Sequence, residues 1–194
     1  MTTENQEIWS PTDLTFFGPD SRSIAFWGEV DEESSLNFIS QLMELSFQYP
    51  EEPITVYLNT TGGSFMDAYA IYDAIQACKS PVTIIATGFC ASAGLTILCA
   101  AEKRFATKNT LFFYHQTILK SDRELISIET SIGTAEAYKL CHDMYDRTII
   151  ATTGMTKEQW KENFKDRTVK YFTAQEALEL GFINGIIPTN ITRS

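Results

Sequence analysis

The sequence predicts a single α/β domain in which strands and helices alternate and most strands run parallel. Short apolar runs rich in β-branched and aromatic residues alternate with segments of helical periodicity over most of the chain. That alternation is typical of βαβ units. The 194 residues suit one domain, because domains commonly hold about 100–200 residues. The chain shows no internal repeat and no low-complexity segment.

The first half of the chain is predicted to start irregularly and then to alternate. Pro11, Gly18 and Pro19 interrupt residues 1–22, which we expect to be an irregular N-terminal segment. We then expect strands at 24–27, 54–58 and 82–86, helices at 32–49 and 64–78, and a turn at 59–63. Apolar residues recur at helical spacing in the first helix: Leu36, Ile39, Leu42, Met43 and Phe47. Ser64 and Asp67 form a predicted capping box for the second.

In the second half, Gly88 is predicted to turn the chain into a helix at 91–101. Short strands follow around Phe105 and at 111–114, and a long helix at 130–152 carries one apolar side: Ile132, Ala135, Tyr138, Cys141 and Tyr145. The pairs Thr156–Gln159 and Thr173–Glu176 predict two further helix starts. Gly181 is a predicted helix stop before a last strand at 182–187. The domain is therefore placed at 23–189, with a C-terminal tail at 190–194.

Composition excludes several classes of function. The chain is 44% hydrophobic and 21% charged, as a globular protein with a core should be, and its formal net charge is −10. An acidic surface disfavours nucleic acids and anionic membranes. The richest apolar stretch, 82–101, is interrupted by polar residues, and the start MTTENQEIWSP lacks the features of a signal peptide. The four cysteines lack metal-type spacing, and three of them, Cys78, Cys90 and Cys99, have apolar neighbours. We expect buried thiols, a reducing cytoplasm, no metal and no cofactor.

Two glycine-containing turns carry the candidate chemistry. Gly62 and Gly63 follow one predicted strand, and the segment 88–94 follows another. Ligands of parallel α/β folds bind at the carboxyl ends of strands. Ser92 at a helix start is well placed to attack a carbonyl, and the amides of Gly63 and Ala93 are candidate oxyanion donors. The alternatives are that Ser92 only caps or packs, and that Gly62-Gly63 is an ordinary turn.

His115 is the candidate base, because it ends the apolar strand that precedes it and histidine titrates near neutral pH. The alternative for His115 is a packed, hydrogen-bonded core histidine. The only other histidine, His142, lies beside Asp143 in the long helix, where a solvated helix face explains it.

In order and spacing, these residues resemble the proteolytic subunit of the Clp protease family. The resemblance rests on YLNTTGGSFMDAYAIYDAI (57–75), SPVTIIATGFCASAG (80–94), KRFATKNTLFFYHQ (103–116) and FTAQEALELGFING (172–185). It covers most of the chain from Trp27 to Ile187. The interval from Gly63 to Ser92 matches the family's interval from oxyanion glycine to serine without a gap.

The resemblance implies a crotonase-like ββα spiral with Ser92 as nucleophile, His115 as base, and Gly63 and Ala93 as the oxyanion hole. It also implies polypeptide substrates and two stacked seven-membered rings joined through a protruding handle, the helix at 130–152. Family members work with hexameric ATP-driven unfoldases, while the peptidase itself binds no ATP. The residue after the serine is often methionine in the family. Alanine at that position retains the backbone amide, which is the group that would stabilise the oxyanion.

The third member of the triad is where this chain departs from the family. Aligned back from 172–174, the family's aspartate falls on Val169; aligned forward from 153–154, it falls on Arg167. The nearest aspartate, Asp166, is the candidate acid, with a solvated charge as the alternative. Loss of the acid can cost about 10⁴ in rate, and a backbone carbonyl or Asn163 could then partly orient the imidazole.

The chain also departs from the family's pattern at two other places. Residues 1–26 do not reproduce the family's apolar axial loop, and Thr60-Thr61 stands where the family usually has Ser-Pro.

An active serine endopeptidase is the leading hypothesis. A weak or inactive ring subunit that assembles with an active paralogue is the second. An acyl-CoA enzyme on the same fold and a Ser-Lys signal-peptide peptidase are disfavoured, because no acidic pair, lysine base or membrane segment stands out.

Overall fold

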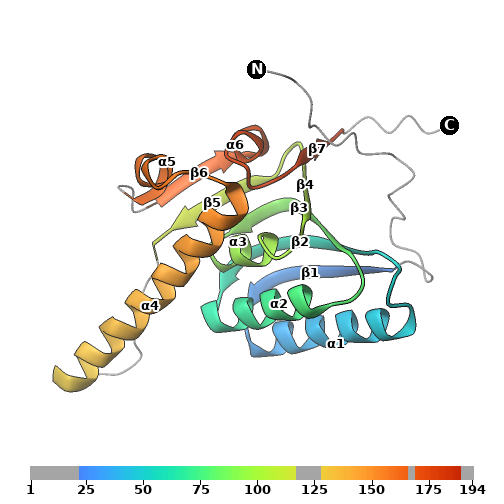
Figure 1. The fold of residues 1–194 in the computed structure, drawn as a ribbon, viewed down its shortest axis with the longest axis horizontal. Coiled ribbons are helices and arrows are strands. Elements are labelled where there is room, and N and C mark those ends of the chain that lie inside the picture. The colour runs from blue at the N-terminus through green and yellow to red at the C-terminus, as the bar shows by residue number, and fades with distance from the viewer. Residues whose placement is uncertain (1–21, 117–127, 166–168, 189–194) are drawn as a thin grey trace.

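A computed structural model describes residues 22–116, 128–165 and 169–188 of the chain (Figure 1). Its strands form one seven-stranded sheet. They are β1 (Ser23–Val30), β2 (Ile54–Gly63), β3 (Val82–Ala91), β4 (Lys103–Thr107), β5 (Leu111–His115), β6 (Val169–Thr173) and β7 (Gly185–Ile187). The helices are α1 (Glu32–Gln48), α2 (Phe65–Ala77), α3 (Ala93–Leu98), α4 (Ile128–Thr153), α5 (Lys157–Trp160) and α6 (Ala174–Glu179), with a π-helical turn at Lys161–Lys165. The predicted α/β class is confirmed.

The sheet divides at β3. The order β1-β2-β3-β4-β7 is parallel throughout, as predicted. The first half of β3 pairs with β4 and its second half, 89–91, pairs with β5. Gly88, at φ 62°, lies between the two halves. β5 then pairs with β6 in the one antiparallel ladder of the described sheet. Because of this division, the carboxyl ends of β3 and β5 lie next to each other.

Two sequence-predicted turns are wrong because the strands continue through them. β2 runs on to Gly63 rather than turning at 59, and β3 runs on to Ala91 rather than turning at Gly88. The register of the β2–β3 pairing shifts around Gly88, between Leu58 and Thr60, and the register of the β1–β2 pairing shifts next to Gly62, between Gly28 and Glu29. The helix predicted at 91–101 shortens to α3, and the last strand shortens to β7.

Helices α1 and α2 lie side by side and pack against β1, and α1 also contacts β2 (Figure 1). α1 starts at a capping box between Asp31 and Ser34, and its buried residues are Ser35, Phe38 and Leu42. The predicted apolar face was therefore partly wrong: Leu36, Met43 and Phe47 are exposed. Ser64 caps α2 by accepting a hydrogen bond from the Asp67 amide at 3.3 Å.

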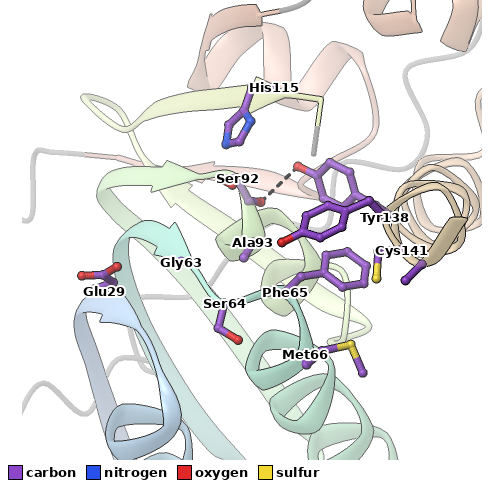
Figure 2. A pocket seen from close by; sticks show the side chains of 12 residues that line it. Glu29, Gly63, Ser64, Phe65, Met66, Ser92, Ala93, His115, Tyr138 and Cys141 are labelled. Atoms are coloured by element: carbon purple, nitrogen blue, oxygen red, sulfur yellow. Dashed lines mark hydrogen bonds between the residues drawn. The ribbon is translucent and has the colours of Figure 1, made fainter. Parts of the chain in front are cut away.

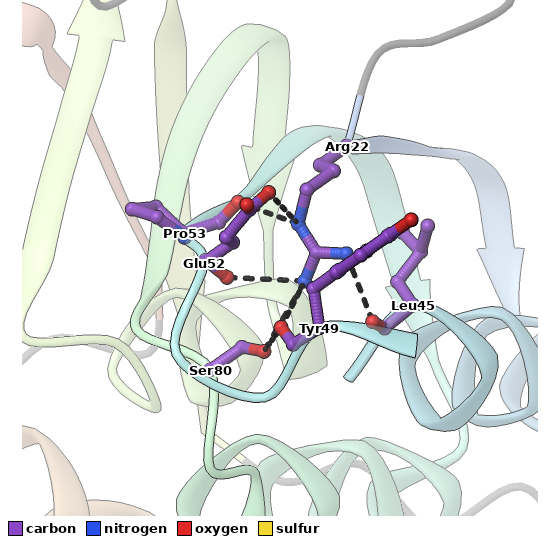
Figure 3. Close-up of polar contacts among 6 residues, drawn as sticks. All are labelled: Arg22, Leu45, Tyr49, Glu52, Pro53 and Ser80. Atoms are coloured by element: carbon purple, nitrogen blue, oxygen red, sulfur yellow. Dashed lines mark hydrogen bonds and ion pairs between the residues drawn. The ribbon is translucent and has the colours of Figure 1, made fainter. Parts of the chain in front are cut away.

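Arg22 fastens the start of β1 to the end of α1 (Figure 3). Its guanidinium donates to the carbonyls of Leu45 at 2.9 Å, Tyr49 at 3.0 Å and Glu52 at 3.0 Å. The Leu45 carbonyl also accepts the Tyr49 amide at 3.3 Å, and Tyr49 and Glu52 follow the helix. A cation at this end of α1 interacts favourably with the partial negative charge of the helix C-terminus. The contact fixes where β1 enters the sheet.

The long helix α4 leaves the body of the domain, as the predicted handle should (Figure 1). Ile132 and Leu140 in the first half of α4 are exposed, whereas Tyr145 and Ile149 in the second half are buried. The buried end packs against an aromatic cluster around Tyr114, Trp160 and Phe164. The predicted capping boxes at Thr156 and Thr173 start α5 and α6.

The predicted irregular segment, apart from Arg22, and the predicted tail at 190–194 lie outside the described residues. Within the described ranges, no helix combines the length and apolar character needed to cross a bilayer. The same residues contain no group of three or more His, Cys, Asp or Glu side chains that could hold a metal ion.

Candidate active site

A pocket of about 500 Å³ opens where β2 and β3 end and α2 and α3 begin (Figure 2). His115 reaches it from the end of β5, and α4 closes one side. Four of the predicted site residues, Gly63, Ser92, Ala93 and His115, line this one pocket. The other lining residues are Glu29, Ser64, Phe65, Met66, Ala137, Tyr138, Cys141 and Tyr145. The pocket therefore combines a polar end with a largely apolar wall.

Ser92 has an unusual backbone. At φ 54° and ψ −122°, it is the one non-glycine residue with positive φ among those described. Such a conformation costs about 1–3 kcal/mol and persists only where its surroundings impose it. The Ser92 amide donates to the Phe113 carbonyl of β5 at 2.8 Å, which ties the residue to the strand that carries His115. Ser92 occupies the N-cap position of α3, yet its side chain makes no capping hydrogen bond. Capping therefore does not explain this serine.

Gly62 lets two strand ends approach closely beneath Ser92. Its φ is 84°, and a Cβ atom there would lie 2.6 Å from the Ser92 Cβ and 2.7 Å from the Ala91 carbonyl oxygen. A Cβ atom on Gly63, at φ 149°, would collide with the backbone of Val30 on β1. The two glycines are thus needed for packing between strands, and the ordinary-turn explanation is wrong.

The peptide between Ser92 and Ala93 is held on its carbonyl side. The Ser92 carbonyl accepts hydrogen bonds from the Leu95 amide at 2.9 Å and from the Tyr145 hydroxyl at 3.0 Å (Figure 2). Ala93 is the first residue of α3, where amides lack carbonyl partners within the helix. From the sequence, Tyr145 is predicted only to lie on the apolar side of its helix, and no pattern in the chain indicates this contact.

His115 is half-buried at the last position of β5, and its ring points toward Ser92 (Figure 2). Its Nδ1 lies 2.6 Å from the carbonyl oxygen of Gln116. A carbonyl can only accept a hydrogen bond, so this contact requires the proton on Nδ1. In the neutral imidazole this tautomer leaves Nε2 without a proton, and such a nitrogen can take a proton from a serine.

No carboxylate stands beside this imidazole in the part of the chain that the structure describes. The residue opposite His115 in the β5–β6 ladder is Val169, and no hydrogen bond or ion pair there joins His115 to an acid. Asp166, the candidate acid, lies outside the described residues. Asn163 does not orient His115: its amide donates to the Gln159 carbonyl at 2.9 Å and accepts from Lys170 at 3.1 Å.

The remaining titratable residues have structural explanations. His142 lies 3.7 Å from Asp146 one helical turn along α4, and it is not among the residues that line the pocket. Cys90 and Cys99 are buried as predicted, and burial raises the pKa of the Cys99 thiol to about 11. Cys78 and Cys141 are half-buried, so the expectation of a buried thiol is only partly met at Cys78.

The chain is similar to known proteins over most of its length. A family model described as Clp protease matches residues 15–190. The chain belongs to the Clp protease family. Among its relatives is the ATP-dependent Clp protease proteolytic subunit 1 of Chlamydia muridarum, 33% identical over 87% of each chain. The proteolytic subunit 2 of Frankia casuarinae is 31% identical over 86% of this chain and 76% of its own.

The fold of this Clp protease family member also matches a solved structure. A mutant of ClpP1 from Listeria monocytogenes aligns with a TM-score of 0.77 and 31% identity, covering 88% of this chain and 94% of that one. This match confirms the expected ClpP-like, crotonase-like fold with its mostly parallel sheet.

Proposed function

We propose that this Clp protease family member is an active serine endopeptidase with Ser92 as nucleophile and His115 as general base. The observation that carries the proposal is the state of Ser92. Ser92 has a positive φ, and its side chain makes no capping hydrogen bond although it is the N-cap residue of α3. The same pocket contains His115, whose Nδ1 lies within hydrogen-bond distance of the Gln116 carbonyl. Strained residues of this kind cluster at active sites.

The proposed chemistry is acyl transfer. His115 Nε2 takes the proton of the Ser92 hydroxyl as the oxygen attacks a peptide carbonyl. The amides of Gly63 and Ala93 stabilise the oxyanion of the tetrahedral intermediate. His115 then gives its proton to the leaving amine, and water hydrolyses the acyl-enzyme by the reverse sequence of proton transfers. The Gln116 carbonyl keeps the imidazole in the required tautomer.

The proposed substrates and partners follow from the relatives. Two of them are named proteolytic subunits of an ATP-dependent Clp protease. The substrates here would accordingly be unfolded polypeptides, delivered by an ATP-driven unfoldase into the chamber of a double seven-membered ring. The protruding α4 is the element available to join two rings.

A fluorophosphonate probe tests the proposal directly, because it reacts with activated serines of this type. The purified oligomer should be labelled once per chain, and Ser92→Ala should abolish labelling. Ser64→Ala is the matched control: Ser64 lines the same pocket but caps α2. Absence of labelling in a correctly assembled wild-type particle would overturn the proposal.

Val169 favours a second candidate, a weakly active or inactive ring subunit. A valine stands opposite His115, so this position supplies no negative charge to stabilise an imidazolium. In that case the chain would form a stable ring without peptidase activity and would gain activity only when mixed with an active paralogue. Full activity of the pure homo-oligomer would eliminate this candidate.

A further inference from the structure

We infer that Tyr145 is a positioning residue that aims the Ala93 amide into the pocket by holding the carbonyl of Ser92. This inference rests on the proposed peptidase function and adds a residue to it. Its basis is the 3.0 Å hydrogen bond from the Tyr145 hydroxyl on α4 to the Ser92 carbonyl oxygen at the start of α3. Figure 2 shows this bond as a dashed line beside Ser92.

The physical link is the planarity of the peptide bond. The Ser92 carbonyl and the Ala93 amide belong to one rigid trans peptide unit, in which C=O and N–H point in opposite directions. Any rotation of this unit moves the amide as far as it moves the carbonyl. A hydrogen bond that fixes the carbonyl therefore fixes the direction in which the Ala93 amide donates.

The Ser92 peptide needs such a fixing contact. Ser92 is in a strained positive-φ conformation, and α3 is only 6 residues long. Within α3, the Ser92 carbonyl accepts only the Leu95 amide, at 2.9 Å. The Tyr145 hydroxyl occupies the second acceptor position of the same oxygen. Two donors from different elements hold the unit better than one helical bond.

Tyr145 is itself well held. Its side chain is 3% exposed. Its ring stacks on Tyr114 with 5.5 Å between centroids and 2° between planes, and the edge contact with Phe65 measures 6.3 Å. Burial raises the pKa of Tyr145 well above its usual value, so the hydroxyl stays protonated and donates. Packing of the ring thus fixes the position of the hydroxyl donor.

The geometry also links the handle to the chemistry. Tyr145 lies in the buried end of α4, the helix whose other end protrudes from the domain. A shift of α4 relative to α3 would lengthen the Tyr145–Ser92 hydrogen bond. The same shift would release the peptide unit that carries the Ala93 amide.

The test compares Tyr145→Phe with wild type in hydrolysis of a short fluorogenic peptide by the purified oligomer. Phenylalanine keeps the ring contacts and removes only the hydroxyl, and Ser92 keeps its bond to Leu95. We expect kcat to fall about tenfold or more while KM stays within about twofold, because the oxyanion forms only in the transition state. The rate of fluorophosphonate labelling should fall by a similar factor.

Tyr69→Phe is the matched control. Tyr69 on α2 makes a 2.6 Å hydrogen bond to Thr148 on α4, so this variant removes a comparable contact to the same helix without touching Ser92. We expect its kcat to stay within about twofold of wild type. Equal falls in kcat for both variants, with equal losses in melting temperature, would show general loosening of α4 and would overturn the inference.

The labelling measurement separates the two proposals. A wild-type oligomer that the probe does not label overturns the peptidase function and this inference with it. A labelled wild type and an equally fast Tyr145→Phe variant overturn the inference alone, and the function stands.

Discussion

Val169 on β6 lies directly opposite His115 on β5 in the antiparallel ladder. Residues paired in this way have their side chains on the same face of the sheet, with Cβ atoms about 4.5–5.5 Å apart. Alignment from the following helix start placed the family's acid at this same position. The chain therefore presents an apolar side chain where a carboxylate could reach the imidazole.

Val169→Asp should increase activity. A carboxylate opposite His115 would stabilise the imidazolium that forms during attack, which the Gln116 carbonyl does less well. We expect kcat for a short peptide to rise by about tenfold or more. Val169→Asn is the control, because it matches the shape without the charge and should give a smaller gain. No gain from either variant would mean that His115 already has an acid partner.

Gly62→Ala should damage both stability and activity. The added methyl group would lie 2.6 Å from the Ser92 Cβ, at a residue whose φ is 84°. We expect a loss of about 2 kcal/mol in the free energy of unfolding and a displaced nucleophile. Gly133→Ala in the exposed part of α4 has no atom within 4 Å and should stabilise the helix by up to about 1 kcal/mol. Urea unfolding of both variants checks this, and a neutral Gly62→Ala would contradict the described packing.

Arg104→Met should strongly destabilise the fold. The Arg104 side chain is buried and donates to the carbonyls of Ala101 at 2.8 Å, Glu102 at 3.2 Å and Phe182 at 2.8 Å. Removal of the guanidinium leaves these carbonyls without this donor, and we expect the free energy of unfolding to fall by about 3 kcal/mol. Exposed Arg147→Met on α4 should stay within about 0.5 kcal/mol of wild type. Similar losses in thermal unfolding for the two would argue against the buried network.

Stability should fall at alkaline pH. Burial raises the pKa of Cys99 to about 11 from 9.0. The folded state therefore holds this proton more tightly than the unfolded state. The contribution is fully present below the unfolded pKa and is lost as pH rises toward the folded one. We expect a loss on the order of 2 kcal/mol from this group by about pH 10.5, measured as the urea midpoint. Cys99→Val should show a shallower decline, and identical slopes would contradict the assignment.

The sequence was sufficient for the elements whose signals are local. Capping at Asp31 was not anticipated, but the pairs at Thr156 and Thr173 predicted two helix starts correctly. Strand ends were predicted poorly, because a glycine such as Gly88 normally indicates a turn. Here β3 continues through Gly88, since the residues before it pair with β4 and the residues after it pair with β5. The exposed Met43 and Phe47 fit a helical period but not the face that packs on the sheet.

The site was predicted as a set of residues but not as a network. Ser92, Ala93, Gly63 and His115 line one pocket because chain order and motif spacing fix strand ends at a shared edge. A backbone carbonyl was one alternative for orienting His115, and the structure places the Gln116 carbonyl there. The contact from Tyr145 to Ser92 depends on three-dimensional placement. No period or motif encodes a hydrogen bond to a backbone carbonyl 53 residues away.

The most direct test of the central claim is hydrolysis of a short fluorogenic peptide by the purified, size-separated oligomer, with wild type and Ser92→Ala compared. A short peptide needs no unfoldase, so the result does not depend on an ATP-driven partner. We expect wild type to cleave the peptide and Ser92→Ala to lose at least about 10³ of the rate. A wild-type oligomer that is fully assembled and silent, or a Ser92→Ala variant that cleaves as fast as wild type, would contradict the account.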